Sequence, residues 1–151
     1  CPYCVRFHPV MEKVIDKYQS KAKWVYRHFP LNFHNNAKKA AEAAEAAGEQ
    51  GKFWEFSSEV AKNSQQDGTG LNTADLEKYA VELGLDMTKF NDAVTSGKYR
   101  QKVEADYNSG VAAGVEGTPS LFMIGKDGKV EKVQSLDEAA LIAKIEAASK
   151  E

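Results

Sequence analysis

The feature of this sequence that most constrains its fold is a pair of cysteines at its start. Cys1 and Cys4 are the only cysteines among the 151 residues, and Pro2 and Tyr3 separate them. On the first turn of a helix, this spacing places both sulfurs close enough to bond to each other. The chain is therefore expected to begin with a helix whose first turn carries both thiols.

Three kinds of chemistry use two cysteines at this spacing. A structural disulfide is one, but so short a loop gains little from loop-closure entropy. A zinc site is another, but tetrahedral zinc takes four ligands, and the chain has no second cysteine pair. The histidines His8, His28 and His34 would complete such a site only if the fold happened to gather them. A redox-active dithiol needs no further ligand, so the spacing favours it and leaves the other two readings open.

Composition argues against several other classes of protein. Hydrophobic residues make up 42% of the chain, which is enough for a folded core. A net charge of −2 gives no basic excess for binding nucleic acid. No apolar run approaches the roughly 18 residues of a membrane-spanning helix, and the first residues do not read as a signal peptide. Because the chain starts at Cys1 and not at methionine, we expect that upstream residues, with any targeting information, were removed.

The order of the predicted elements indicates an α/β core interrupted by helices. A helix is expected over residues 5–20, bent by the internal Pro9, and a strand over the aromatic and β-branched residues 24–29. Helical patterns then follow without a strand signal between them, over residues 37–47, 50–63, 73–83, 86–96 and 99–113.

The last part of the chain returns to strands. Residues 120–124 and 130–133 are expected to form an antiparallel hairpin, because Asp127 and Gly128 supply the positive φ angles of a tight turn. A final amphipathic helix is expected to bury Leu141, Ile142 and Ile145. The helical stretch is therefore an insertion within one α/β core.

Several local motifs occur in the order typical of one known family. They are the CPYC motif followed by Phe7 and Pro9, Phe29-Pro30-Leu31, Gln50-Gly51-Lys52-Phe53-Trp54, Leu83-Gly84-Leu85-Asp86, and Gly114-Val115-Glu116-Gly117-Thr118-Pro119. Over essentially its whole length the chain resembles the DsbA-like thiol-disulfide oxidoreductases, which have a thioredoxin fold with a helical insertion. The resemblance implies that residues 1–31 and 115–151 form the thioredoxin-like core and that residues 32–114 form the inserted helical subdomain.

In this family a central strand of the sheet runs directly into the cysteine motif, and that strand is missing from this sequence. A sheet without its central strand leaves backbone groups of the neighbouring strands unpaired, which is costly. We therefore expect at least ~10 further residues upstream in the natural protein, enough for one strand and its approach. Direct pairing between residues 24–29 and residues 120–124 would contradict this expectation.

The start of the first helix is expected to give the two cysteines different roles. Cys1 would be exposed over the unpaired N–H groups of the first turn, which together with the helix dipole stabilise a thiolate. Cys1 is therefore expected to form the mixed disulfide with a substrate, and the covered Cys4 to resolve it. Pro2 fits the first helical position, where its missing N–H costs nothing, and Tyr3 is placed to modulate the reduction potential. His8, one turn beyond Cys4, is interpreted as a solvated surface residue more readily than as a tuning group.

Thr118 and Pro119 are the second part of the expected site. The resemblance implies that Pro119 is cis and faces the cysteines, and that the backbone of Thr118 pairs with an extended substrate segment. Without the resemblance, Pro119 would be interpreted as an ordinary loop proline before a strand.

The resemblance implies a protein thiol-disulfide oxidoreductase, acting as an oxidase of exported proteins without a cofactor or a metal. Its expected partners are cysteine-containing substrate proteins and a DsbB-like membrane redox partner, with no nucleic acid, in the periplasm or another extracytoplasmic space. The alternatives are a glutathione-dependent oxidoreductase or isomerase of the same fold, and a zinc-binding or structural module. A glutaredoxin fits less well, because the chain lacks the Thr-Val-Pro and Gly-Gly motifs of that class. The sequence itself leaves the direction of exchange and the oligomeric state open.

Overall fold

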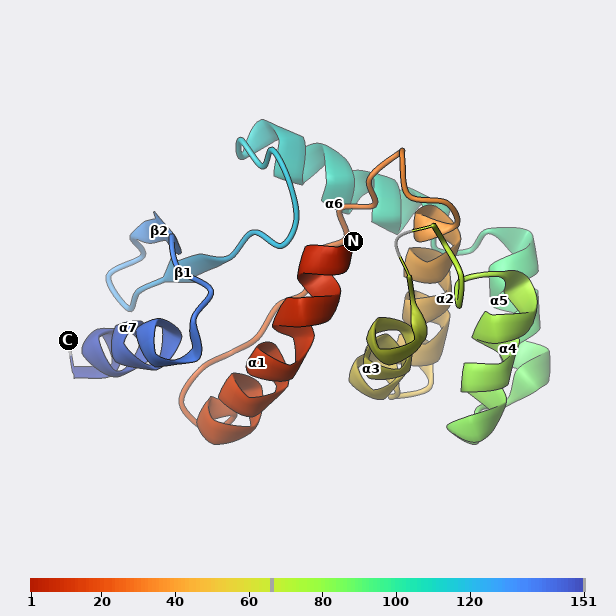
Figure 1. The fold of residues 1–151 in the computed structure, drawn as a ribbon, viewed down its shortest axis with the longest axis horizontal. Helices are drawn as coiled ribbons and strands as arrows, with labels where there is room; N and C mark the ends of the chain where they lie inside the picture. Colours follow the sequence, from red (N-terminus) through yellow and green to blue (C-terminus); the bar gives the residue numbers. More distant parts are fainter. Residues whose placement is uncertain (66, 151) are drawn as a thin grey trace.

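The computed structural model describes residues 1–65 and 67–150, and these residues form seven helices and one two-stranded sheet. The elements, in chain order, are α1 Pro2–Tyr18, α2 Ala37–Glu49, α3 Phe53–Asn63, α4 Thr73–Glu82, α5 Met87–Ser96, α6 Arg100–Ala112, β1 Phe122–Ile124, β2 Val130–Lys132 and α7 Glu138–Lys150 (Figure 1).

Helix α1 begins at the cysteine motif itself. Cys1 is the N-cap and Pro2 the first helical residue, where the fixed φ of proline suits the helix and its missing N–H leaves no donor unpaired. Pro9 lies inside the helix, as the sequence predicts. The helix contacts α3 on one side and α7 on the other, so it stands between the inserted helices and the C-terminal part of the chain (Figure 1).

The predicted helices of the insertion are all present, and their ends follow local chemistry. Asn72 and Asp75 form a reciprocal capping box at the start of α4, with Asp75 N–H donating to Asn72 Oδ1 over 2.9 Å. The expected end of α2 at residue 47 is wrong, because the helix runs on through Gly48 to Glu49. Gly48 instead gives room to Phe53, whose Cβ would lie 3.2 Å from a Cβ at residue 48.

The predicted strand over residues 24–29 is wrong. Among the described residues, β1 pairs antiparallel with β2 alone, with Met123 opposite Glu131. A strand needs a partner for its backbone groups, and the N–H of His28 goes instead to the carboxylate of Asp106, 3.2 Å away. Residues 24–29 therefore do not pair with β1, and the expectation of a further central strand stays a prediction.

Two hydrophobic clusters hold the described elements together. The larger one lies in the inserted helices and consists of Ala40, Ala43, Ala44, Ala46, Ala47, Phe56, Leu71, Leu76, Tyr79, Ala80, Leu85, Phe90 and Ala93. The smaller one joins α1, α7 and the hairpin through Phe7, Val14, Tyr18, Val133 and Leu141. Because the five buried residues of α2 are all alanine, α3, α4, α5 and α6 can all contact this helix closely. The division of the chain into two units at residues 31 and 115 stays a prediction.

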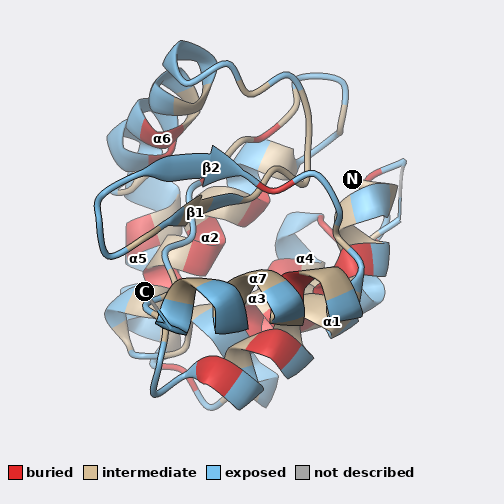
Figure 2. Cartoon of the chain, turned by 90° about the vertical axis from the view of Figure 1, so that its left-hand side faces the viewer, coloured by how far each residue is buried: buried red, intermediate tan, exposed pale blue. Residues whose placement is uncertain are grey.

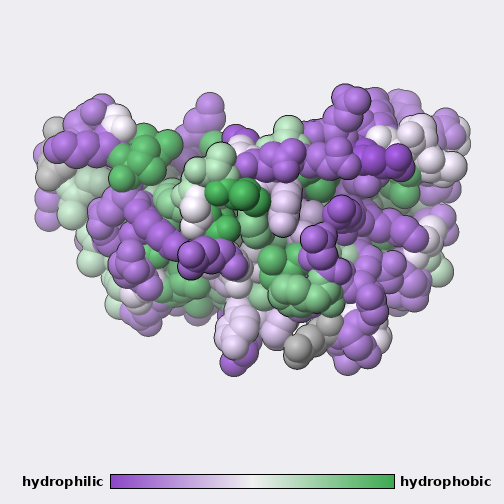
Figure 3. All heavy atoms as spheres, turned by 90° about the horizontal axis from the view of Figure 1, so that it is seen from above, coloured by the Kyte–Doolittle hydropathy of each residue, from purple (hydrophilic) through white to green (hydrophobic). Residues whose placement is uncertain are grey.

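Helix α6 lies across one end of the molecule, and the segment that follows it leads back past the start of α1 to the hairpin (Figure 1). Buried residues concentrate on the helices, whereas both strands of the hairpin show mostly exposed or partly exposed residues (Figure 2). Seen from the α6 side, hydrophobic patches lie toward the middle of the face among hydrophilic side chains (Figure 3). In the described part of the chain, no helix has the length and apolar character needed to cross a membrane.

Candidate active site

The structure brings the cysteine motif and the Thr118–Pro119 loop together. The thiol of Cys1 donates to the carbonyl oxygen of Thr118 over 3.4 Å, although 117 positions separate the two residues in the chain. The peptide bond between Thr118 and Pro119 is cis. The two stretches expected to form one site are therefore neighbours, while the roles of their residues stay predictions.

The first turn of α1 offers unneutralised N–H groups next to the thiols. No acidic residue lies in this turn, and the side chain of Cys1 makes no capping hydrogen bond. The positive end of the helix dipole is therefore available to an anion formed at Cys1. Cys1 and Cys4 are both free thiols, and each residue is partly buried. The burial of the whole residues therefore does not show the expected contrast between an exposed and a covered cysteine.

Pro2 and Tyr3 form the outer side of the motif. The Tyr3 side chain is 64% exposed, and the Arg6 guanidinium lies over its ring, 4.9 Å from the ring centre. The Arg6 Nε also donates to the carbonyl of Pro2 over 3.5 Å. The ring of Tyr3 is therefore exposed and carries a cation on its face, within the cysteine motif.

The loop opposite the thiols is held by its own hydrogen bond. The Ser120 hydroxyl donates to the carbonyl of Gly117 over 2.7 Å, which closes a tight turn around Thr118 and Pro119. The Thr118 hydroxyl is buried and has no hydrogen-bond partner among the described residues. The hydrogen bond from Cys1 therefore goes to the backbone of Thr118 and not to its hydroxyl.

Tyr26 lies near Cys4, a proximity that the sequence reasoning missed. Loss of solvation and, to a smaller extent, negative charge on Cys4 together raise the pKa of Tyr26 to about 12, although 44% of the residue surface is exposed. The ring makes edge contacts with His28, Phe53 and Trp54, at centroid distances of 5.1, 5.2 and 6.2 Å. The only feature of the sequence that marks this position is the run of aromatic residues within residues 24–29, and such a run is equally typical of a strand.

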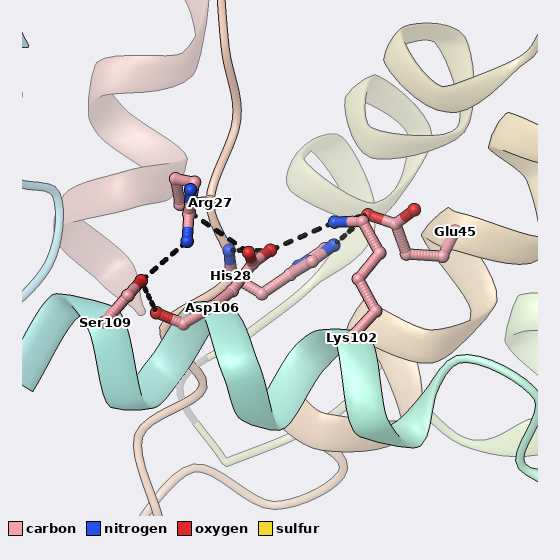
Figure 4. A network of polar contacts seen from close by, with 6 residues as sticks. All are labelled: Arg27, His28, Glu45, Lys102, Asp106 and Ser109. Carbon is pink, nitrogen blue, oxygen red and sulfur yellow. Dashed lines mark hydrogen bonds and ion pairs between the residues drawn. The ribbon is translucent and has the colours of Figure 1, made fainter.

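His28, for which the sequence suggested no partner, belongs to a polar network between α2 and α6 (Figure 4). Its Nε2 lies 2.9 Å from Glu45 Oε1, and Lys102 Nζ lies 2.8 Å from Glu45 and 3.0 Å from Asp106. Arg27 pairs with Asp106 over 3.1 Å.

Three residues of this network, His28, Glu45 and Asp106, have ligand atoms within 4.8 Å of one another, as a metal site requires. However, Lys102 and Arg27 already balance the two carboxylates, and the Lys102 ammonium takes the position beside them that a metal ion would need.

We expect the free energy of unfolding to fall as the pH drops below about 6.5, because of His28. Burial lowers the pKa of His28 from its ordinary 6.5, and the hydrogen bond that His28 makes to Glu45 opposes this only in part. Above that pH, His28 is neutral in both the folded and the unfolded chain, and its contribution to the free energy of unfolding is fully present. Below it, the unfolded chain takes up a proton before the folded chain does, so stability is lost until the pH falls through the folded pKa. One proton can change the stability by at most about 1.4 kcal/mol per pH unit.

Urea unfolding between about pH 7.5 and pH 5 measures this slope. The variant His28→Gln is expected to flatten it, and His34→Gln, which removes a histidine outside the network, is expected to keep it. Equal slopes in the two variants would contradict the assignment to His28. The lowered pKa of Asp106 acts at more acidic pH and does not overlap with this window.

The interpretation of His8 as a surface residue is wrong. The residue is 9% exposed, and its Nε2 lies 3.0 Å from the hydroxyl of Ser58 on α3. The Ser58 hydroxyl donates to Glu12, one turn further along α1, and this hydrogen bond is the main cause that lowers the pKa of Glu12. This contact could not be expected from local patterns, because its partners come from separate helices.

A hollow of about 470 Å³ lies between α2 and α6, away from the thiols. Its lining is mostly polar and includes no cysteine: Pro30, Asn32, Lys38, Glu42, Arg100, Val103, Glu104, Tyr107 and Asn108. It is therefore not part of the site around Cys1.

Comparison with known families decides the classification of this chain. The sequence profile of the family described as "Thioredoxin" matches residues 1–144, which is nearly the whole chain. The chain belongs to the thioredoxin family. Among curated proteins, this thioredoxin-family chain is 35% identical over 127 residues to the Na(+)/H(+) antiporter NhaA 3 of Salinispora tropica, a match that covers 83% of the chain and 19% of the antiporter. The chain thus spans about a fifth of the length of the curated relatives it matches.

Solved structures show which form of the thioredoxin fold the chain has. DsbA2 of Pseudomonas aeruginosa matches with a TM-score of 0.77 at 22% identity, covering 100% of this chain and 84% of that one. The thiol-disulfide exchange protein alpha-DsbA2 of Wolbachia pipientis matches with a TM-score of 0.79 at 22% identity, covering 97% and 75%. The expected fold class, a thioredoxin-like α/β fold with a helical insertion, is therefore confirmed.

Proposed function

We propose that this chain exchanges disulfides with cysteine-containing proteins through Cys1 and Cys4, and that it acts as an oxidase. The observation that carries the proposal is the position of the Cys1 thiol, at the N-terminus of α1 and in contact with the Thr118 carbonyl. Membership of the thioredoxin family and the likeness to DsbA-type structures support the same chemistry. Sodium–proton antiport is not part of the proposal, because the similarity covers only about a fifth of those proteins.

In the oxidising direction, a substrate thiolate attacks the sulfur of Cys1 in a Cys1–Cys4 disulfide. The S–S bond breaks, Cys4 leaves as a thiolate that takes up a proton, and a mixed disulfide joins Cys1 to the substrate. A second substrate thiolate then attacks the substrate sulfur of this mixed disulfide, and Cys1 leaves as a thiolate. The substrate loses two electrons as its disulfide forms, and the Cys1–Cys4 pair gains them.

The assignment of Cys1 as the attacked sulfur follows from its surroundings. A leaving thiolate at Cys1 is stabilised by the N–H groups and the dipole of α1, which no acidic side chain in the first turn offsets. The exposed Tyr3 and the backbone of Thr118 flank the same thiol, so an extended substrate segment can contact both while its cysteine reaches Cys1. Pro2 and Pro119 fix the backbone on the two sides.

A dithiol produced by each turnover must be oxidised again. We propose that a DsbB-like membrane protein accepts the two electrons, in the periplasm or another extracytoplasmic space. Disulfides form and persist in such compartments, and a chain whose only cysteines are the Cys1–Cys4 pair has no other thiol that could be oxidised there by mistake.

The proposed function is tested by trapping the mixed disulfide. The variant Cys4→Ala has no resolving thiol, so its Cys1 thiolate should attack the disulfide of oxidised insulin and remain attached to one insulin chain. Mass spectrometry under non-reducing conditions should show a nearly stoichiometric adduct, which dithiothreitol releases.

The matched control is Cys1→Ala, which keeps one thiol in the same motif and should give no such adduct. An adduct on Cys4 in the control, with none on Cys1 in the test variant, would reverse the assigned roles. Stoichiometric zinc on the purified protein, lost in both variants, together with absence of the adduct, would favour the zinc-binding module instead.

A further inference from the structure

The second half of α6 is held from one side by the backbone and side chains of residues 27–29. Arg27 donates through Nη2 to the hydroxyl of Ser109 over 2.7 Å, and its Nε lies 3.1 Å from Asp106 Oδ1. The N–H of His28 donates to Asp106 Oδ2 over 3.2 Å (Figure 4). Lys102, on α6 itself, lies 3.0 Å from the same oxygen. The Asp106 side chain is only 9% exposed, and both of its carboxylate oxygens accept hydrogen bonds or pair with a cation. These contacts hold α6 against residues 27–29.

Apolar contacts fix the same part of the helix. The ring of Phe29 stacks on Tyr107 at a centroid distance of 4.6 Å and an angle of 26°. It also lies against Gly110, where a Cβ would come within 2.7 Å of the ring. Glycine at this position therefore permits the close approach, and α6 has little freedom to shift relative to residues 27–29.

A short connection joins the end of α6 to the candidate active site. The N–H of Val115 donates to the carbonyl of Gly110 over 2.9 Å, which closes the end of the helix. Gly114 reverses the chain with a φ of 75°, and Thr118 follows four residues later. The carbonyl of Thr118 accepts the hydrogen bond from the thiol of Cys1.

We propose that Asp106 is a positioning residue, which sets through α6 where the Thr118 carbonyl stands relative to the Cys1 thiol, and that it thereby tunes the dithiol–disulfide equilibrium. The inference rests on the proposed function. Cys1 can donate to Thr118 only as a protonated thiol of the reduced form, because neither a disulfide nor a thiolate carries an S–H. Weakening the hold on α6 therefore removes a contact of the dithiol alone and shifts the equilibrium toward the disulfide.

The test replaces Asp106→Asn. The amide is close in shape, but in either orientation its NH₂ group faces a donor: Arg27 on one side, or the His28 N–H and Lys102 on the other. We expect the equilibrium constant with glutathione, measured at a pH low enough to protonate the Cys1 thiol, to shift about two- to tenfold toward the disulfide, the factor that corresponds to one ordinary hydrogen bond. Arg27→Gln, at an arginine whose side chain is 58% exposed, is expected to shift it in the same direction and covers the case in which the first variant does not fold.

The matched control is Glu49→Gln, which removes a carboxylate that contacts the two residues directly before α6. Glu49 lies 2.5 Å from Lys98 and 2.7 Å from the hydroxyl of Tyr99, at the opposite end of the helix, and no such link leads from there to Thr118. Its equilibrium with glutathione is expected to equal that of the wild type. If Asp106→Asn and Arg27→Gln lower the free energy of unfolding but leave the dithiol–disulfide equilibrium with glutathione unchanged, the inference is overturned. If the wild type itself forms no reversible Cys1–Cys4 disulfide with glutathione, the proposed function fails, and the inference fails with it.

Discussion

Replacement of Cys1 by serine is expected to lower the rate of thiol-disulfide exchange by a factor on the order of 10³ or more. The sulfur of Cys1 is the atom that we propose joins the chain to its substrate, and a serine hydroxyl forms no disulfide. Serine is close to cysteine in size, and the side chain of Cys1 makes no capping hydrogen bond, so α1 should still begin at the same residue. Two assays measure the loss: the reduction of insulin by dithiothreitol, and the transfer of a disulfide to a reduced peptide.

The comparison variant for this prediction is Cys4→Ser. It should also fail to turn over, but its Cys1 thiolate can still attack a disulfide of insulin and should accumulate the mixed disulfide, whereas Cys1→Ser should accumulate none. Circular dichroism should show the same helix content for both variants. Exchange activity retained by Cys1→Ser would remove the basis of the proposed mechanism.

The second large effect concerns stability. Phe56→Ala is expected to lower the free energy of unfolding by about 3–5 kcal/mol, the range for removing a fully buried phenylalanine. Phe56 is 0% exposed and lies in the larger cluster, with ring centroids 5.7 Å from Phe90 and 6.4 Å from Tyr79. The truncation removes its apolar contacts and leaves a cavity among helices that cannot fully close around it. Urea unfolding followed by circular dichroism measures the change.

The same substitution at an exposed phenylalanine is the control. Phe33 is 76% exposed, and Phe33→Ala should change the free energy of unfolding by no more than about 0.5 kcal/mol. Equal costs at the two positions would mean that the larger cluster does not contribute to stability as its burial indicates.

Features set by neighbouring residues could be predicted from the sequence. Pro2 directly after an N-cap position indicates a helix start, and Asn72 with Asp75 indicates another. The hairpin was likewise predicted from Asp127 and Gly128, but only Gly128 has the expected positive φ, at 79°, whereas the Asp127 side chain accepts a hydrogen bond from the Lys129 N–H. The meeting of Cys1 with Thr118 was expected only from the family resemblance, since nothing in the local sequence links two residues that far apart.

Features that depend on distant partners could not be predicted in this way. Residues 24–29 have the composition of a strand, but a strand also needs a neighbour, and sequence preference carries no information about one. His8 and His28 were assigned without partners because Ser58 and Glu45 lie on other helices. The hold of Arg27 on Asp106, which carries the further inference, joins residues 79 positions apart and has no local signature.

The contact of His8 with Ser58 has a consequence for how the chain unfolds. Helix α1 gives Phe7 and Val14 to the smaller cluster, while His8 and Glu12 attach it to α3, which carries Phe56 of the larger cluster. If either cluster unfolded, α1 would lose its contacts on that side, and its contacts with the other cluster would become less stable. The two clusters are therefore expected to unfold together, in a single cooperative transition. A destabilising substitution among the inserted helices should then also destabilise the helix that carries the two cysteines.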